Sequence, residues 1–340
     1  MKKITEYIFL CLIVPISLNI IIYFGFTSQY TGNVFSKDTF LKQYNNGIYK
    51  YRFFSKILLL DTYKAINTLH DETEPKKFIK FLDEQGTNNF YASYFILNTF
   101  FSILLAIIIY YCIFNSHYFN FSGYYEKVIS FLFINLIMYV SEYVIVPYDF
   151  SGYTFFIISS ILTLAYIKQN NILLMAIICL ILIISTLNRE TSYISLTFFT
   201  TLIVTEKGIK NNIFKLLIPI LCFTGTYLGL RIYMGFENGI LEKIINNFEI
   251  NVLIINLFIL VFCIGLSYIA FRMTSNKMNK RKMMIFLLLN TPYILTCLLG
   301  GRWFELRLFI PLYLGLIFLS KLDIHYLNDV SHTINLSTNK

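Results

Sequence analysis

The sequence predicts an all-α, polytopic membrane protein with about ten transmembrane helices. Hydrophobic residues make up 56% of the 340 positions and charged residues 14%, whereas a soluble domain is about half apolar and a quarter charged. The apolar residues form long runs, and a bilayer core requires about 20 of them per helix. Runs such as 172–187 and 252–271 do not alternate apolar and polar residues, as membrane β-strands do. Helices are therefore the expected spanning elements.

We treat the whole chain, 1–340, as a single polytopic membrane domain. The expected spans are about 6–26, 93–114, 128–148, 153–168, 171–187, 192–205, 214–234, 250–271, 283–300 and 308–320. The first span follows Lys2 and Lys3, but its apolar stretch is too long for a signal peptide and no small-residue cleavage site follows it. We therefore expect it to be retained as a helix.

The distribution of Lys and Arg orients these spans. If Lys2 and Lys3 are cytoplasmic, alternation puts fourteen Lys and Arg residues on the cytoplasmic side and five on short outer loops and helix ends. The other nine lie in the first loop, which is too long for the positive-inside rule to apply. This bias follows the positive-inside rule, and the segment 272–282 (RMTSNKMNKRK) is its strongest anchor. Both termini, including the tail 321–340, are predicted to be cytoplasmic, with 27–92 as a long extracytoplasmic loop.

The remaining composition excludes several classes of function. The net charge of +9 arises from basic clusters between apolar runs, so we expect no nucleic-acid partner. The six cysteines all lie in apolar runs, which is typical of packing residues. The four histidines lie outside the spans, and neither a P-loop nor a GxGxxG or HExxH motif occurs. These features disfavour a metal site within the membrane.

The first loop, 27–92, is basic and aromatic. Helical spacing in 61–69 and 75–84 predicts short helices along the membrane surface. Cations alternate with aromatic residues in YNNGIYKYRFFSK (44–56), around Tyr51 and Arg52. This pattern suits a sugar phosphate or, alternatively, plain contact with lipid headgroups. Either partner carries negative charge.

Three short segments at the outer helix ends carry further ionisable groups, which usually face a cavity or a partner when they lie at membrane depth. In LNRETS (187–192), Arg189 offers a planar donor fork suited to phosphate, and Glu190 can accept a proton. The alternative is a helix cap whose arginine reaches the headgroups.

The segments GGRWFELR (300–307) and PYDFSGY (147–153) each have a structural alternative as well. Arg302 and Glu305 share a helical face and can pair, while Arg307 points elsewhere. Asp149 follows Pro147 in a tight turn, and turn chemistry alone accounts for an aspartate there.

Two further ionisable residues are candidates for lining a cavity. Glu142 lies within the third expected span, and Arg231 lies near the outer end of the seventh. The two side chains can form a buried pair.

Taken in order, the Tyr51–Arg52 step, the PYD turn, LNRETS and RWFELR resemble bacterial membrane glycosyltransferases of the GT-C type and the related polymerases of O-antigen and capsule clusters. The resemblance covers most of the chain. It implies a donor sugar linked to a polyprenyl (pyro)phosphate, a glycan acceptor and a location in the bacterial inner membrane. It also implies an acidic catalytic residue in the first outer loop, where Asp38 and Asp61 compete. The short 235–250 loop leaves transferase and polymerase open.

Such a transfer requires a general base and positive charge on the departing phosphate. We assign the base to Asp38, Asp61 or Glu190. We expect Arg52, Arg189 and either Arg302 or Arg307 to bind the phosphate. The other predicted substrate-binding residues are Tyr51, Asp149 and Glu305. We expect no resident cofactor, and the role of a divalent cation stays open.

Two other functions compete with the enzyme. A flippase or transporter of lipid-linked sugars would carry charged groups along the full depth of a central path. The middle spans are nearly free of charge, which favours the enzyme. In a structural subunit of a larger complex, the charged helix ends would be coincidental.

Overall fold

The computed structural model describes residues 2–25, 36–72, 89–143, 145–236, 250–274, 276–300, 305–323 and 326. Across these ranges every regular element is a helix, and the sole β-bridge joins Phe119 to Leu322. The all-helical fold expected from the sequence is confirmed.

The longer elements are α1 (Lys2–Ile8), α2 (Val14–Gly25), α4 (Lys37–Tyr44), α5 (Phe53–Glu72), α7 (Asn89–Tyr110), α8 (Tyr124–Val140), α9 (Asp149–Gln169), α10 (Ile172–Asn188), α11 (Ser192–Glu206), α12 (Ile213–Met234), α14 (Ile250–Arg272), α15 (Lys277–Leu289), α16 (Thr291–Gly300) and α17 (Ile310–Ser320). The shorter turns are η1 (Phe9–Ile13), η2 (Gly47–Tyr51), η3 (Tyr111–Asn115), η4 (Ser141–Tyr143), η5 (Lys210–Asn212) and η6 (Leu306–Leu308).

Each of the ten expected ranges contains helix, but four helices in the described part are long and apolar enough to cross a bilayer. These are Lys3–Tyr23, Asn89–Asn115, Asp149–Gln169 and Ile213–Met234. The apolar helices Ile172–Asn188, Leu260–Arg272 and Ile310–Ser320 are shorter. The chain thus has the helices of a membrane protein, and the number of its spans stays a prediction.

Two expected spans differ from the observed helices. The range 128–148 extends too far, because α8 ends at Val140 and η4 follows it with non-helical angles at Glu142. The range 283–300 is divided between α15 and α16 at Asn290, whose side chain donates a hydrogen bond to the carbonyl of Phe286. At the end of α8, Ser141 donates a hydrogen bond to the carbonyl of Met138, so at both breaks a polar side chain bonds the backbone locally, as is common where helices bend or end.

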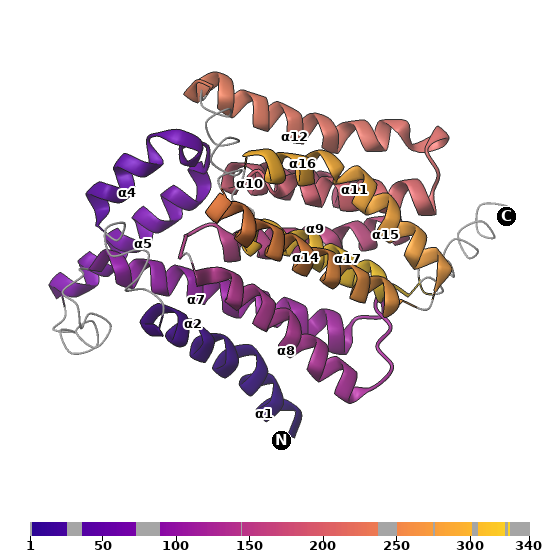
Figure 1. Ribbon diagram of the computed structural model, residues 1–340, viewed down its shortest axis with the longest axis horizontal. Coiled ribbons are helices and arrows are strands. Elements are labelled where there is room, and N and C mark those ends of the chain that lie inside the picture. Colours follow the sequence, from indigo (N-terminus) through magenta and orange to yellow (C-terminus); the bar gives the residue numbers. More distant parts are fainter. Residues whose placement is uncertain are drawn as a thin grey trace.

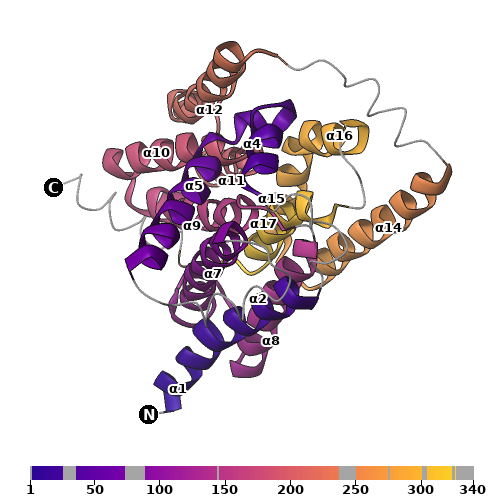
Figure 2. The same cartoon turned by 90° about the vertical axis from the view of Figure 1, so that its left-hand side faces the viewer.

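Helix α9 occupies the middle of the bundle, where it packs against α7, α10, α11 and α17 (Figures 1 and 2). Its sequence is apolar or small on all sides, including Gly152, Ser159 and Ser160. A helix without a polar face is expected to be buried. By contrast, α12 lies at the periphery, and few of its residues are buried (Figure 2).

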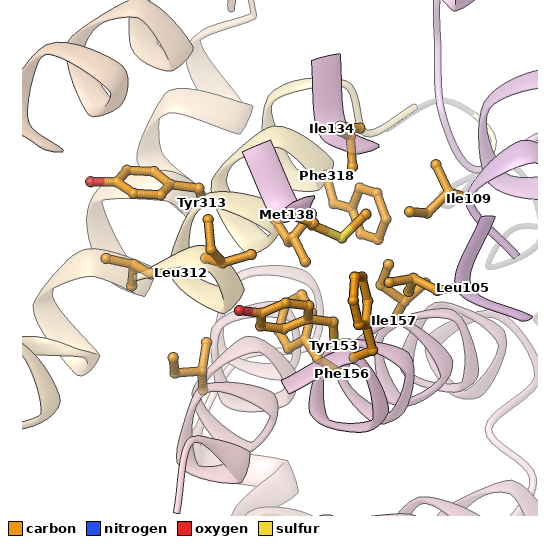
Figure 3. Close-up of a cluster of buried hydrophobic side chains, with 14 of the residues drawn as sticks. Leu105, Ile109, Ile134, Met138, Tyr153, Phe156, Ile157, Leu312, Tyr313 and Phe318 are labelled. Atoms are coloured by element: carbon orange, nitrogen blue, oxygen red, sulfur yellow. The ribbon is translucent and has the colours of Figure 1, made fainter. Parts of the chain in front are cut away.

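The interior beside α9 is tightly packed. Leu105 of α7, Met138 of α8, Ile157 of α9 and Phe318 of α17 converge in one apolar cluster (Figure 3). Gly315 of α17 allows the ring of Phe286 to approach so closely that a Cβ atom there would lie 2.5 Å from that ring. The core therefore depends on side chains from helices that are far apart in the sequence.

The first loop contributes α4, η2 and α5, which cover one end of the bundle, at the left of Figure 1. Helix α5 includes the 61–69 segment expected to be helical, and it packs against α7 and α10. The expected helix at 75–84 lies outside the described residues. The covered end is where the ionisable segments meet.

Candidate functional site

Three arginines from distant parts of the chain are buried around the start of α9. Arg52 follows η2, Arg189 lies between α10 and α11, and Arg307 belongs to η6. All three surround the Tyr148–Asp149 step. We call Arg52, Arg189, Arg307, Tyr148 and Asp149 the arginine cluster. Each arginine is at most 6% exposed, and Asp149 is fully buried.

The local sequence determines how Arg189 enters the cluster. Helix α10 ends at Asn188, and Arg189 adopts an extended backbone before α11 begins at Ser192. The side-chain amide of Asn188 donates to the carbonyl of Tyr148 at 3.0 Å, and Ser151 donates to the side-chain oxygen of Asn188 at 3.0 Å. These bonds join the end of α10 to the beginning of α9.

Asp149 links two of the arginines. Its carboxylate accepts a hydrogen bond from Arg189 and lies 3.6 Å from the Nη1 atom of Arg307. As the first residue of α9, it also carries negative charge at a helix N-terminus, which is favourable. The aspartate of the PYD turn is therefore part of a buried ion network.

Two glutamates extend this network. Arg307 donates two hydrogen bonds to Glu305, at 2.9 and 3.1 Å. This pairing differs from the expectation that Arg307 points away from Glu305, because residues 306–308 form a 3₁₀ turn. Glu190 lies 3.8 Å from Arg52. Its side chain is 29% exposed, so it is the most accessible carboxylate of the network.

Tyr148 lies between the three guanidinium groups. The centre of its ring is 3.9 Å from the Cζ atom of Arg52, 5.2 Å from that of Arg189 and 6.0 Å from that of Arg307. A ring face attracts cations at these distances, so Tyr148 partly offsets the repulsion between the arginines. The PYD turn is evident in the sequence, but no role for its tyrosine was predicted from it.

Several buried donors in the cluster have no hydrogen-bond partner. They are the Nη1 atom of Arg52, the Nε atom of Arg52, which lies 3.8 Å from Glu190, and the Nη1 atom of Arg307, which lies 3.6 Å from Asp149. Buried polar groups are normally satisfied, and guanidinium donors match the oxygens of phosphate or carboxylate. The arrangement is suited to an anionic ligand.

A second group of side chains lies between η2 and the end of α12. Tyr51 donates a hydrogen bond to the carbonyl of Gly235 at 2.7 Å. Arg231 lies over the rings of Tyr227 and Tyr51, at 3.6 and 4.5 Å. The anticipated pair between Arg231 and Glu142 is wrong, because Glu142 lies instead beside Arg307 and Asp149.

Asp38 and Asp61 are not brought into the cluster. Asp38 is exposed in the first turn of α4. Asp61 is exposed on α5 and pairs with Lys64 at 2.9 Å. Arg302 lies outside the described residues. Within the described ranges, no group of three His, Cys, Asp or Glu side chains could hold a metal ion.

Charged pairs also occur at the end of α11 that lies away from the arginine cluster. Since α11 has 15 residues, this end is about 22 Å from its start. Lys282 and Glu206 form a buried pair at 2.5 Å. Burial, reinforced by the charge of Lys215, lowers the pKa of Lys207 to about 8. Burial raises the pKa of Glu126, but hydrogen bonds from Lys321 and Ser122 outweigh it and hold that pKa below its ordinary value.

No protein-family model, curated protein or solved structure matches this chain. The helical fold and the geometry of the arginine cluster therefore carry the functional argument.

Proposed function

We propose that this chain is a membrane glycosyltransferase or polymerase that uses sugars linked to polyprenyl (pyro)phosphate at the extracytoplasmic face, in the synthesis of a surface polysaccharide. The observation that carries the proposal is the arginine cluster, in which three buried guanidinium groups lie around Tyr148, and those of Arg52 and Arg307 have donors without a hydrogen-bond partner. Guanidinium donors match the oxygens of phosphate in charge and geometry. A (pyro)phosphate headgroup supplies such oxygens.

The proposed reaction uses the cluster to stabilise the leaving group. The acceptor hydroxyl oxygen forms a bond to the anomeric carbon of the donor, and the bond from that carbon to the phosphate oxygen breaks. Arg52, Arg189 and Arg307 stabilise the negative charge that develops on the departing phosphate.

The proton of the acceptor hydroxyl requires a nearby carboxylate. We assign this role to Glu190, which is partly exposed beside Arg52. Asp38 and Asp61 are exposed on α4 and α5, which makes them weaker candidates for a base beside the arginine cluster.

The packing of the bundle supports an enzyme over a flippase. In the middle of the bundle, α9 packs against apolar side chains of other helices, such as Leu105, Met138 and Phe318 (Figure 3). A flippase requires a polar path through this region, whereas the described side chains of this cluster are apolar.

The proposal is tested by deleting the gene and analysing the glycan of cells complemented with wild type, Arg189→Ala, Glu190→Gln or Lys64→Ala. Wild type and the exposed control Lys64→Ala should restore the glycan, while the first two variants should reduce it by at least tenfold at equal membrane levels. Loss of chain length with one repeat unit retained indicates a polymerase, and loss of one sugar indicates a transferase. Unchanged glycan with Arg189→Ala, or an intermediate trapped inside the cell, overturns the proposal.

A further inference from the structure

Glu142 is a buried carboxyl group that the ion network does not use. The residue is 2% exposed, and neither of its side-chain oxygens has a hydrogen-bond partner. It lies in η4, which packs against η6 next to Arg307. Because buried polar groups are nearly always hydrogen-bonded, this exception points to a missing partner.

The groups around Glu142 come from several elements. The charged groups that act on it are Asp149 of α9, Arg307 of η6 and Arg189 after α10. Tyr23 of α2, Tyr139 of α8 and Tyr153 of α9 lie close enough to feel its charge. Tyr139 and Tyr153 donate their protons to the carbonyls of Pro15 and Arg307, so neither proton is directed at Glu142.

The charges of the network are balanced without Glu142. Three arginines are joined by ion pairs to three carboxylates, Asp149, Glu190 and Glu305. Ionised Glu142 would add an uncompensated negative charge, which is costly in a buried site. It would also repel an incoming phosphate. A protonated Glu142 adds no charge and offers an O–H donor beside Arg189 and Arg307.

We propose that Glu142 is protonated in the working protein and donates a hydrogen bond to the phosphate oxygen that Arg189 and Arg307 hold. It is thus a ligand-binding residue of the arginine cluster, selective for acceptor oxygens of a (pyro)phosphate diester. This inference rests on the proposed function and names a further contact with its donor substrate. No covalent bond changes, and the proton stays on Glu142.

The test measures the binding of farnesyl methyl diphosphate to the full-length protein in nanodiscs between pH 6 and 9.5. Each phosphate of this probe carries one charge throughout that range, so the probe itself does not titrate. Wild type should bind at low pH and lose about tenfold in affinity per pH unit once Glu142 ionises, because one proton is linked to binding.

Three variants separate the donor role from a structural one. Glu142→Gln keeps a neutral donor, so it should bind within about threefold of wild type at pH 6 and stay constant to pH 9.5. Glu142→Ala should bind at least tenfold more weakly at pH 6. Glu206→Gln, a buried glutamate at the other end of α11, should retain the wild-type profile. A probe-induced change in the infrared band of a protonated carboxyl should appear in wild type and vanish in Glu142→Gln.

The outcomes distinguish this inference from the proposed function. If wild type does not bind the probe at any pH, the anion site and the proposed donor substrate are both overturned. If wild type binds but Glu142→Gln shows the same loss of affinity with pH, or keeps the infrared change, only the role of Glu142 is overturned.

Discussion

Asp149 is the residue on which the arginine cluster depends most. It contacts both Arg189 and Arg307 without being exposed. Removing one partner of a buried ion pair leaves an uncompensated charge and costs about 3–5 kcal/mol. The exposed pair of Asp61 and Lys64 is worth about 0–1 kcal/mol.

This difference gives a direct comparison between two Asp→Asn substitutions. Asp149→Asn should lower the free energy of unfolding by about 3 kcal/mol, measured by denaturant unfolding in detergent. Asp61→Asn should change it by less than about 1 kcal/mol. Equal effects of the two substitutions would contradict the placement of Asp149 in a buried network.

Lys207 provides a pH-dependent prediction. Its pKa is about 8 in the folded protein and ordinarily 10.5, so between these values the unfolded state binds more protons and rising pH favours folding. The melting temperature of wild type should therefore increase relative to that of Lys207→Gln between pH 7.5 and 9.5. A difference that does not change with pH would contradict the burial of this amine.

At the residue scale, the sequence made Arg52, Asp149, Arg189 and, as an alternative to Arg302, Arg307 candidates, because each lies in a short charged segment next to apolar runs. It did not identify the role of Tyr148, because that role depends on arginines brought together from three distant segments. Asp38 and Asp61 were candidates only because they lie in the first outer loop, where the resemblance implies an acidic catalytic residue. Both are exposed because other faces of α4 and α5 pack inward. That a residue belongs to the loop does not reveal which face of its helix packs inward.

Among the elements, α15 and α17 are held together by an unusually close contact. A Cβ atom at Gly315 would lie 2.5 Å from Phe286, which is itself fully buried and cannot move aside easily. Overpacking of this kind typically costs about 1–3 kcal/mol.

Gly315→Ala should therefore lower the free energy of unfolding by about 1–3 kcal/mol. A Cβ atom added at Gly265 of α14 would meet no other atom beyond its own helix within 4 Å. Gly265→Ala is therefore the matched control and should be neutral or slightly stabilising. Thermal melts in the same detergent compare the two. If Gly315→Ala left the stability unchanged, α15 and α17 would have to lie further apart than described.

Helix positions were largely predictable because apolar runs and polar breaks alternate along the chain. The exceptions have local causes. Glu142 adopts non-helical angles after α8, and at Asn290 the side chain also accepts a hydrogen bond from Thr197 of α11. That contact is between helices, so hydropathy alone does not reveal where α15 ends.

For the whole molecule, the charge distribution predicts that the end of the bundle carrying α4 and α5 faces outward and that 272–282 faces the cytoplasm. In intact cells, a membrane-impermeant maleimide should label Lys64→Cys at an exposed position of α5 and should not label Lys280→Cys. Cells made permeable should allow both to react. If only Lys280→Cys were labelled in intact cells, the protein would have the opposite orientation, which would contradict the proposed outer site.

The central claim is that the arginine cluster drives the release of a polyprenyl (pyro)phosphate during sugar transfer. The most direct measurement uses purified protein in liposomes with the lipid-linked intermediate that accumulates when the gene is deleted, and follows the free lipid (pyro)phosphate released after acceptor is added. Wild type should release it with a matching gain of glycan, and Arg189→Ala should release at least tenfold less. Equal release by both proteins, or movement of the intact intermediate across the bilayer without release, would contradict the claim.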